Sequence, residues 1–340
     1  MKKVVCFGEL MLRLNPSGYL RIVQADALNI SFAGGEANVA VSLANFGMES
    51  YFVSKLPRTV LGEAARNSLR RYGVQTKDIL WGGPRIGVYF VEKGASQRAS
   101  NVIYDRAGSS VQLSKRDEYD WNSILEGADW FYFTGITPAL GGALPDICID
   151  ALEACKRKGV KVGCDLNYRK KLWSAEAACR TMSKMMPYVD VLIANESDAY
   201  DVFGIKAHST DLEKGILDKL AYAEVARSLS EKFGISTVAI TLRTSISASV
   251  NRWAGMMHKD GVDYYSPEYT INIVDRIGGG DSFGAGLIYS LSKECSPQRT
   301  IDFAVAASCL KHSIENDFNL VSEEEVMSLV SGNASGRVLR

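Results

Sequence analysis

The sequence has no excess charge of either sign and no hydrophobic run long enough to cross a membrane. Lysine plus arginine and aspartate plus glutamate both number 39, so the formal net charge is zero. Without a basic field, neither a nucleic-acid nor a membrane partner is indicated. No apolar stretch reaches the ~18 residues that a membrane-spanning helix needs. The apolar run after Lys2 and Lys3 is also too short for a signal peptide, so we expect a first strand there.

The seven cysteines include no C-x-x-C pair, which is the spacing typical of metal and redox motifs. Their number is odd, and most have apolar neighbours. Disulfides persist mainly in oxidising compartments, so unpaired thiols of this kind are typical of a reduced cytoplasmic interior. We therefore expect a cytoplasmic protein with reduced cysteines in its core.

Three consecutive glycines, Gly278, Gly279 and Gly280, separate a β-branched apolar run at 270–274 from a helical pattern. At such a junction, unpaired backbone N–H groups and the helix dipole attract anions. Asp281 follows directly, where it can take a proton from a hydroxyl that attacks a bound phosphate. Phosphoryl transfer is therefore our working hypothesis. On local spacing alone, a tight turn with a helix-capping aspartate is an equally good interpretation.

A second glycine turn lies near the N-terminus, at Gly34 and Gly35. Apolar residues at helical spacing, including Val39 and Leu43, begin directly after it. A polar Asn38 in the first turn of an otherwise apolar helix suits a ligand hydroxyl. A simple helix start explains the same pattern equally well.

From about residue 121, short apolar runs alternate with helical patterns. This alternation predicts an α/β fold with a mostly parallel sheet and helices on both faces. Ligands in this architecture bind at the carboxyl ends of the strands. The strand-like runs are at 130–133, 160–164, 189–193 and 238–242, and helical patterns include 144–158 and 221–233.

Two further β segments, at 10–32 and 86–106, precede this alternation. The second reads as a hairpin, with strands at 87–91 and 101–106 around a polar turn. A hairpin between α/β units does not fit a parallel sheet, so we expect a small accessory sheet that acts as a lid over the site. We expect one domain over 1–340 with this lid inserted in it. The exposed lid edge predicts a homo-oligomer.

Polar residues follow two neighbouring strands of the predicted sheet. Asp165, Asn167 and Arg169 follow one strand, and Asn195 and Asp198 follow the next. Such residues at several strand ends are what an active site in this architecture requires. Taken singly, Asp165 and Asn195 are better explained as capping residues. Arg169 is harder to explain in this way because it lies directly after a strand rather than on a helix face.

Together these segments resemble the ribokinase-like, or PfkB, family of carbohydrate kinases over nearly the whole chain. Residues 34–38 are similar to the family's sugar-binding signature, and residues 275–286 are similar to its C-terminal signature. Two signatures in the family's order are more specific than either alone. The resemblance implies that Asp281 deprotonates the acceptor hydroxyl and that 278–280 stabilise the transferring phosphoryl group.

Within the family, the chain resembles the branch that phosphorylates 2-keto-3-deoxygluconate, chiefly at 104–106 and 165–173. A sugar acid requires a cation, and a guanidinium pairs with a carboxylate through two hydrogen bonds, so Arg106 and Arg169 are candidates on chemical grounds too. For the tyrosines, a place in the lid core is the alternative to binding. The implied substrate contacts are Gly34, Gly35, Asn38, Tyr89, Tyr104, Arg106, Arg169, Asp281 and Asp317.

The resemblance also implies ATP as phosphoryl donor and Mg²⁺ as cofactor. The family's Asn-x-x-Glu magnesium motif runs here from Asn195 to Asp198, with a carboxylate one methylene shorter that bridging waters could compensate. The nucleotide loop at 242–247 lacks the family's two glycines. The implied nucleotide contacts are Asn167, Asn195, Thr241, Leu242, Arg243, Ser247, Gly278 and Gly280.

Two other functions remain as alternatives. A neutral-sugar kinase of the ribokinase or fructokinase type would need no paired arginines. A non-catalytic sugar-binding regulator on the same fold would need no base at Asp281. The sequence therefore favours ATP-dependent phosphorylation of the terminal hydroxyl of a sugar acid.

Overall fold

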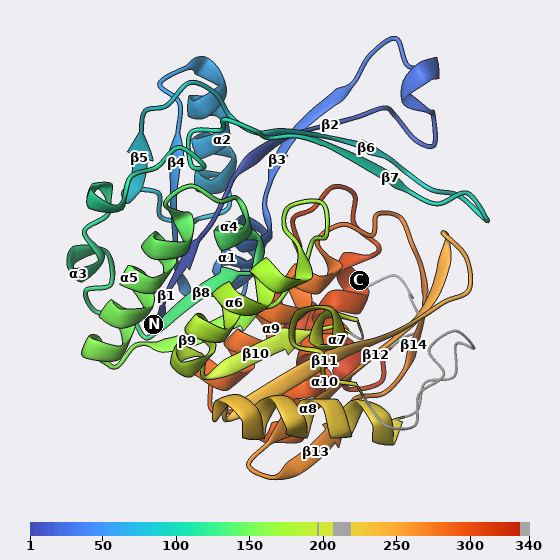
Figure 1. Ribbon diagram of the computed structural model, residues 1–340. Coiled ribbons are helices and arrows are strands. Elements are labelled where there is room, and N and C mark those ends of the chain that lie inside the picture. Colours follow the sequence, from blue (N-terminus) through green and yellow to red (C-terminus); the bar gives the residue numbers. More distant parts are fainter. Residues whose placement is uncertain (196, 207–218, 334–340) are drawn as a thin grey trace.

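The computed structural model describes residues 1–195, 197–206 and 219–333, and it contains the predicted mostly parallel sheet (Figure 1). The strands of this sheet are β1 (Lys3–Phe7), β4 (Glu49–Leu56), β5 (Ile79–Trp81), β8 (Trp130–Thr134), β9 (Lys161–Asp165), β10 (Val191–Ala194), β11 (Thr237–Ser245), β12 (Val250–Lys259), β13 (Val262–Tyr265) and β14 (Tyr269–Asn272). Their order is β13-β12-β11-β10-β9-β8-β1-β4-β5, and β14 pairs with β12. Pairing is parallel from β11 to β5 and antiparallel at the β12 edge.

Helices cover both faces of this sheet (Figure 1). They are α1 (Gly35–Asn45), α2 (Val60–Arg70), α3 (Trp121–Ile124), α4 (Ile136–Ala139), α5 (Leu144–Lys158), α6 (Ala175–Met185), α7 (Asp198–Phe203), α8 (Lys219–Phe233), α9 (Gly279–Ser292), α10 (Pro297–Lys311) and α11 (Glu323–Val330). Side chains alternate between two cores, because successive residues of a strand point to opposite faces. Val4 and Cys6 of β1 pack in the core with α1, α9 and α10. Val5 and Phe7 pack in the core with α5, α6 and α8.

None of the described helices combines the length and apolar character needed to cross a membrane.

The predicted lid is confirmed as a separate four-stranded sheet. Its strands are β2 (Met11–Asn15), β3 (Asn29–Ala33), β6 (Val88–Glu92) and β7 (Asn101–Asp105), in the order β3-β2-β6-β7. In Figure 1 the lid extends across the top of the molecule, from beside α2 toward the right of the view. The tip of the β6–β7 hairpin reaches the turn after β11, where the Ser96 backbone N–H donates to Ser249 Oγ at 2.9 Å. The lid is thus anchored to the main body at its far end.

The prediction of a loop at 242–247 is wrong for residues 242–245, which belong to strand β11. Strand β11 continues to Ser245 and pairs in antiparallel register with β12, with Arg243 opposite Trp253. Cross-strand hydrogen bonds and the alternation of a buried Leu242 with an exposed Arg243 extend the strand. The turn that joins the two strands therefore begins only after Ser245.

Candidate active site

Two glycine turns that lie far apart in the sequence meet at Asp281. This residue is in the first turn of α9, and its Oδ2 accepts a hydrogen bond of 2.7 Å from Nδ2 of Asn38 in α1. A methyl group added at Gly35 would lie 3.6 Å from Asp281 Oδ1 and 4.0 Å from Asn167 Nδ2. The absent side chain of Gly35 therefore leaves space directly beside the Asp281 carboxylate. A substrate hydroxyl would fit in that space.

The surroundings of Asp281 suit a general base. Burial raises the pKa of its carboxyl to about 7, whereas the hydrogen bond from Asn38 acts in the opposite direction. The negative charges of Asp317 and Glu36 raise this pKa further, and Arg169 lowers it. A base with a pKa near neutral is available as a carboxylate and still has a useful affinity for a proton.

Each of the three positions before Asp281 is a glycine for a different structural reason. Gly278 has a left-handed backbone with φ of 85°, and a side chain there would overlap the Asp317 carbonyl oxygen. At Gly279, a Cβ would lie 2.6 Å from the buried ring of His312. Gly280 is exposed and has open space where a Cβ would project. Packing thus requires the first two glycines, and the third leaves the N–H groups of the helix start accessible to an anion.

Two buried carboxylates lie beside each other, Asp165 at the end of β9 and Asp198 at the start of α7, and Asp165 also lies near Asp281. Burial raises the pKa of Asp165 well above its usual range, and the charges of Asp198 and Asp281 raise it further. Burial also raises the pKa of Asp198 to about 6, although the cation of Arg169 lowers it. The mutual repulsion of these acids favours a bound cation. Sequence reasoning placed Asp165 among the strand-end residues of the predicted active site but, taken singly, explained it as a capping residue and gave it no role toward a metal.

The predicted magnesium residues differ in what they can offer a metal. Asn195 Oδ1 accepts hydrogen bonds from the backbone N–H groups of Ser197 (2.9 Å) and Asp198 (3.1 Å), so it caps the start of α7. Among the described residues, no three acidic, histidine or cysteine side chains converge as a metal site. Asp165 and Asp198 fit Mg²⁺ nonetheless, because this ion usually keeps several waters and takes only one or two protein carboxylates.

The two predicted carboxylate-binding arginines lie in different environments. Arg106 donates twice to Glu9 Oε2, with its Nε at 2.7 Å, and Glu9 is buried. Its guanidinium also lies 5.3 Å from the ring centre of Tyr104. Arg169 is exposed, and its positive charge acts on Asp281 and Asp198. Sequence reasoning missed Glu9, which no local pattern distinguishes.

A buried ionic network joins the lid to Asp317. The Tyr89 hydroxyl donates to Asp317 Oδ2 at 2.8 Å, and Arg13 of β2 donates to the other oxygen. Arg13 also donates to Asp275 Oδ2 at 2.6 Å. Because both Asp317 oxygens have internal partners, its contact with substrate stays a prediction. A lone arginine in an apolar strand was the signal that could have identified Arg13.

The two lid tyrosines differ in exposure. Tyr89 is 2% exposed and therefore belongs to the lid core as well as to the network around Asp317. Tyr104 is 46% exposed and stacks on Tyr89, with 5.9 Å between ring centres. Tyr104 therefore has free surface for a ligand, whereas Tyr89 offers mainly support.

The predicted nucleotide residues lie on β11 and in the turn that follows it. Leu242 is buried in the core, so its side chain is not available to a nucleotide. Thr241 is half-buried and Arg243 is exposed. Ser247 Oγ accepts from the backbone N–H of Val250 at 3.0 Å and so shapes the turn. Nucleotide contacts at Thr241, Arg243 and Ser247 stay predictions.

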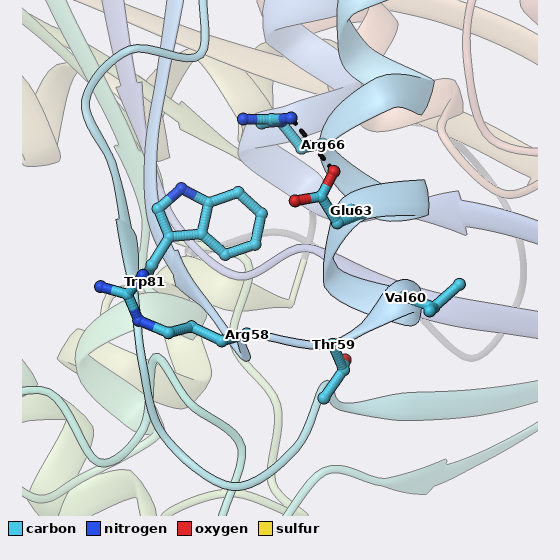
Figure 2. A pocket seen from close by; sticks show the side chains of 6 residues that line it. All are labelled: Arg58, Thr59, Val60, Glu63, Arg66 and Trp81. Atoms are coloured by element: carbon cyan, nitrogen blue, oxygen red, sulfur yellow. Dashed lines mark hydrogen bonds and ion pairs between the residues drawn. The ribbon is translucent and has the colours of Figure 1, made fainter.

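A hollow on the surface at the start of α2 contains none of these residues. Figure 2 shows Arg66 near Trp81 and joined to Glu63, with a guanidinium-to-ring distance of 5.1 Å and an ion-pair distance of 3.2 Å. Its lining residues are Arg58, Thr59, Val60, Glu63, Arg66 and Trp81.

Comparison with known proteins identifies close relatives along the whole chain. The pfkB family carbohydrate kinase pattern matches residues 1–316. The crystal structure of 2-dehydro-3-deoxygluconokinase from Thermotoga maritima superimposes with a TM-score of 0.94 at 50% identity, covering 97% of this chain and 98% of that one. A PfkB family carbohydrate kinase from Listeria grayi has a TM-score of 0.90 at 34% identity, covering 97% and 100%. The 2-dehydro-3-deoxygalactonokinase of Haloferax volcanii is 32% identical over 335 residues, 98% of both chains.

Proposed function

The chain belongs to the pfkB family of carbohydrate kinases, and from this premise we propose that it phosphorylates the terminal hydroxyl of 2-keto-3-deoxygluconate at the expense of ATP. The observation that carries the proposal is the position of Asp281. Its carboxyl, with a pKa of about 7, lies in the first helical turn beside the open Gly280. Base and anion-binding N–H groups are thus adjacent in one turn.

The reaction follows from this arrangement. The acceptor hydroxyl gives its proton to Asp281, and its oxygen forms a bond to the γ-phosphorus of ATP. The bond between that phosphorus and the β–γ bridging oxygen breaks, and ADP leaves with the electron pair. The N–H groups around Gly280 stabilise the negative charge of the transferring group.

The choice of a sugar acid rests on two arginines, Arg169 and Arg106. Arg169 is exposed and acts on Asp281, and Arg106 lies beside the exposed ring of Tyr104. Guanidinium groups suit a carboxylate substrate because they offer paired donors and a permanent charge. The relatives named for 2-dehydro-3-deoxygluconate, the same compound, and for its galactonate epimer point to the same substrate class.

Mg²⁺ is the proposed metal, and Asp165 and Asp198 would hold it through water. When bound, the ion neutralises charge on the phosphates. The two carboxylates repel each other, which is consistent with a cation between them. Asn195 contributes by fixing the backbone at Asp198.

We also propose that two copies associate through the lid. Strands β3 and β7 are its outer strands, and Ile30 and Ile103 on them are 64% and 48% exposed. Exposed apolar side chains at a free sheet edge favour pairing with another chain. Light scattering of wild type and Ile103→Lys would test this, since a dimer insensitive to the change would contradict it.

A cytoplasmic location is consistent with the seven unpaired cysteines.

A panel of acceptors decides between substrates. ADP release would be measured with 2-keto-3-deoxygluconate, its galactonate epimer, ribose and fructose. We expect turnover with the keto-deoxy acids and little with the neutral sugars. Efficient turnover of ribose or fructose, without the acids, would replace the proposal by a neutral-sugar kinase. Binding of a sugar without any ADP release would favour a regulator.

A further inference from the structure

Two arginines without acidic partners lie near the glycine turn of α9. Arg276 stands two residues before Gly278, and Arg243 lies on β11. Arg13 and Arg106, by contrast, each pair with a buried carboxylate. Within the described part of the chain, no carboxylate forms an ion pair with Arg243 or Arg276, and the positive charge of Arg243 acts on Arg276.

The register of β11 and β12 directs Arg243 toward the glycine turn. Arg243 lies opposite Trp253, and directly opposed residues of paired strands share one face of the sheet. The Trp253 ring packs against His312, with 5.0 Å between ring centres. His312 in turn lies beneath Gly279 and accepts, through its carbonyl oxygen, the N–H of Val274 at 2.8 Å. The face of the β11–β12 hairpin that carries Arg243 is thus connected, through Trp253 and His312, to the segment that carries Arg276.

The position of Arg276 is electrostatically unfavourable, and a bound anion would remove this penalty. Its side chain is half-buried, and its Nε is shielded from solvent without a hydrogen-bond partner. Burial lowers the pKa of Arg276, and the like charge of Arg243 lowers it further. A partly desolvated cation beside another cation is unfavourable until a negative group pairs with both.

We propose that Arg276 and Arg243 bind the phosphate chain of the nucleotide together. The inference rests on the proposed kinase function and names the groups that recognise the nucleotide in this chain. The segment 242–247, which comprises the end of β11 and the turn after it, lacks the family's two glycines, whose backbone would otherwise approach the nucleotide. Guanidinium groups supply in their place a fixed charge and paired donors for phosphate oxygens.

Kinetics of Arg276→Gln and Arg243→Gln test the assignment. The control is Arg252→Gln on β12, which lies opposite Thr244 on the other face of the hairpin and is 3.9 Å from Glu268. Loss of a charge-assisted contact should raise KM for ATP roughly ten- to hundredfold in each test variant. KM for the sugar acid should stay unchanged, and Arg276→Lys should recover part of the loss. The control should behave as wild type.

A binding measurement separates this role from a structural one and from the kinase proposal itself. ADP with Mg²⁺ should raise the Tm of wild type, whereas adenosine should raise it much less. In both glutamine variants the ADP shift should be largely lost, although Tm without ligand should not fall, because a like-charge contact has been removed. A full ADP shift with unchanged KM would overturn the inference. Wild type that binds ADP but phosphorylates no sugar acid would overturn the proposed function alone.

Discussion

Arg13 on the lid strand β2 donates a hydrogen bond of 2.6 Å to Asp275, at the start of the segment that leads to Gly278. The Arg13 side chain has no exposed surface, and the Asp275 side chain is 2% exposed. Asp275 also accepts the backbone N–H of Ile277 at 3.2 Å. A single buried carboxylate therefore connects the position of the lid with the backbone that leads into the glycine turn at 278–280.

Replacing Arg13 with Met should strongly destabilise the protein. The change leaves Asp275 and Asp317 buried without their cation, which typically costs about 3–5 kcal/mol. Urea denaturation would measure the free energy of unfolding. Lys2→Met, which removes an exposed ion pair with Asp129, is the control and should leave the midpoint nearly unchanged. Equal midpoints for Arg13→Met and wild type would show that the network does not hold the lid.

The rate of phosphoryl transfer should depend on the ionisation of Asp281. Since the carboxylate form is the base, kcat/KM should rise with pH through about 7, the pKa of this residue. Asp281→Asn should lower kcat by about 10²–10⁴-fold while sugar binding persists. Calorimetry with the sugar acid checks binding. Near-normal turnover of the variant would exclude Asp281 as the base.

Asp281 should also make the folded protein less stable at alkaline pH. Its pKa is about 7 in the folded chain, against about 3.9 in an unfolded one. The folded state therefore binds more protons between these values, and its stability falls as pH rises through this range. Asp281→Asn removes this term, so the variant should gain stability relative to wild type at pH 8 but not at pH 4. A gain that is independent of pH would contradict the assignment.

Alanine at Gly279 and at Gly280 should have different consequences. The added methyl at Gly279 would lie 2.6 Å from the His312 ring, so Gly279→Ala should lower Tm, and a second change, His312→Ala, should restore part of it. Gly280 has free space, so Gly280→Ala should fold normally. It should nevertheless reduce kcat about tenfold or more, because the methyl hinders access of phosphate to the helix start. Normal kcat in Gly280→Ala would contradict an anion site there.

Arg106→Met should raise KM for the sugar acid more than for the corresponding alcohol. The variant also leaves Glu9, its buried partner, without a cation. The double variant Glu9→Gln with Arg106→Met should therefore regain stability but not affinity for the acid. Arg169 is exposed, so Arg169→Met should affect the acid KM with little change in Tm. Equal KM effects on acid and alcohol would exclude carboxylate recognition by these arginines.

The sequence by itself determined the fold class, the lid and the reaction type. Apolar runs that alternate with helical patterns predict a covered parallel sheet because periodicity reports burial directly. The expected helix at 144–158 coincides with α5. Asp281 became a candidate base because a glycine run, a helix start and an acid are local features of one segment, and the second signature at 34–38 then favoured a phosphate site over a simple turn. Local patterns of this kind can be read without knowing any partner.

Only the tertiary structure decided which charged groups meet. Glu9 and Arg106 are 97 residues apart, and Arg13 and Asp275 are 262 apart. Nothing in the local pattern of either residue specifies its partner, because such pairing depends on how the lid packs against the main sheet. The same holds for Arg276, which follows Asp275 in the sequence yet forms no ion pair with a carboxylate in the described part of the folded chain, since Asp275 pairs with Arg13 instead. Burial and long-range electrostatics, which shift the pKa of Asp281 to about 7, exist only once these segments are together.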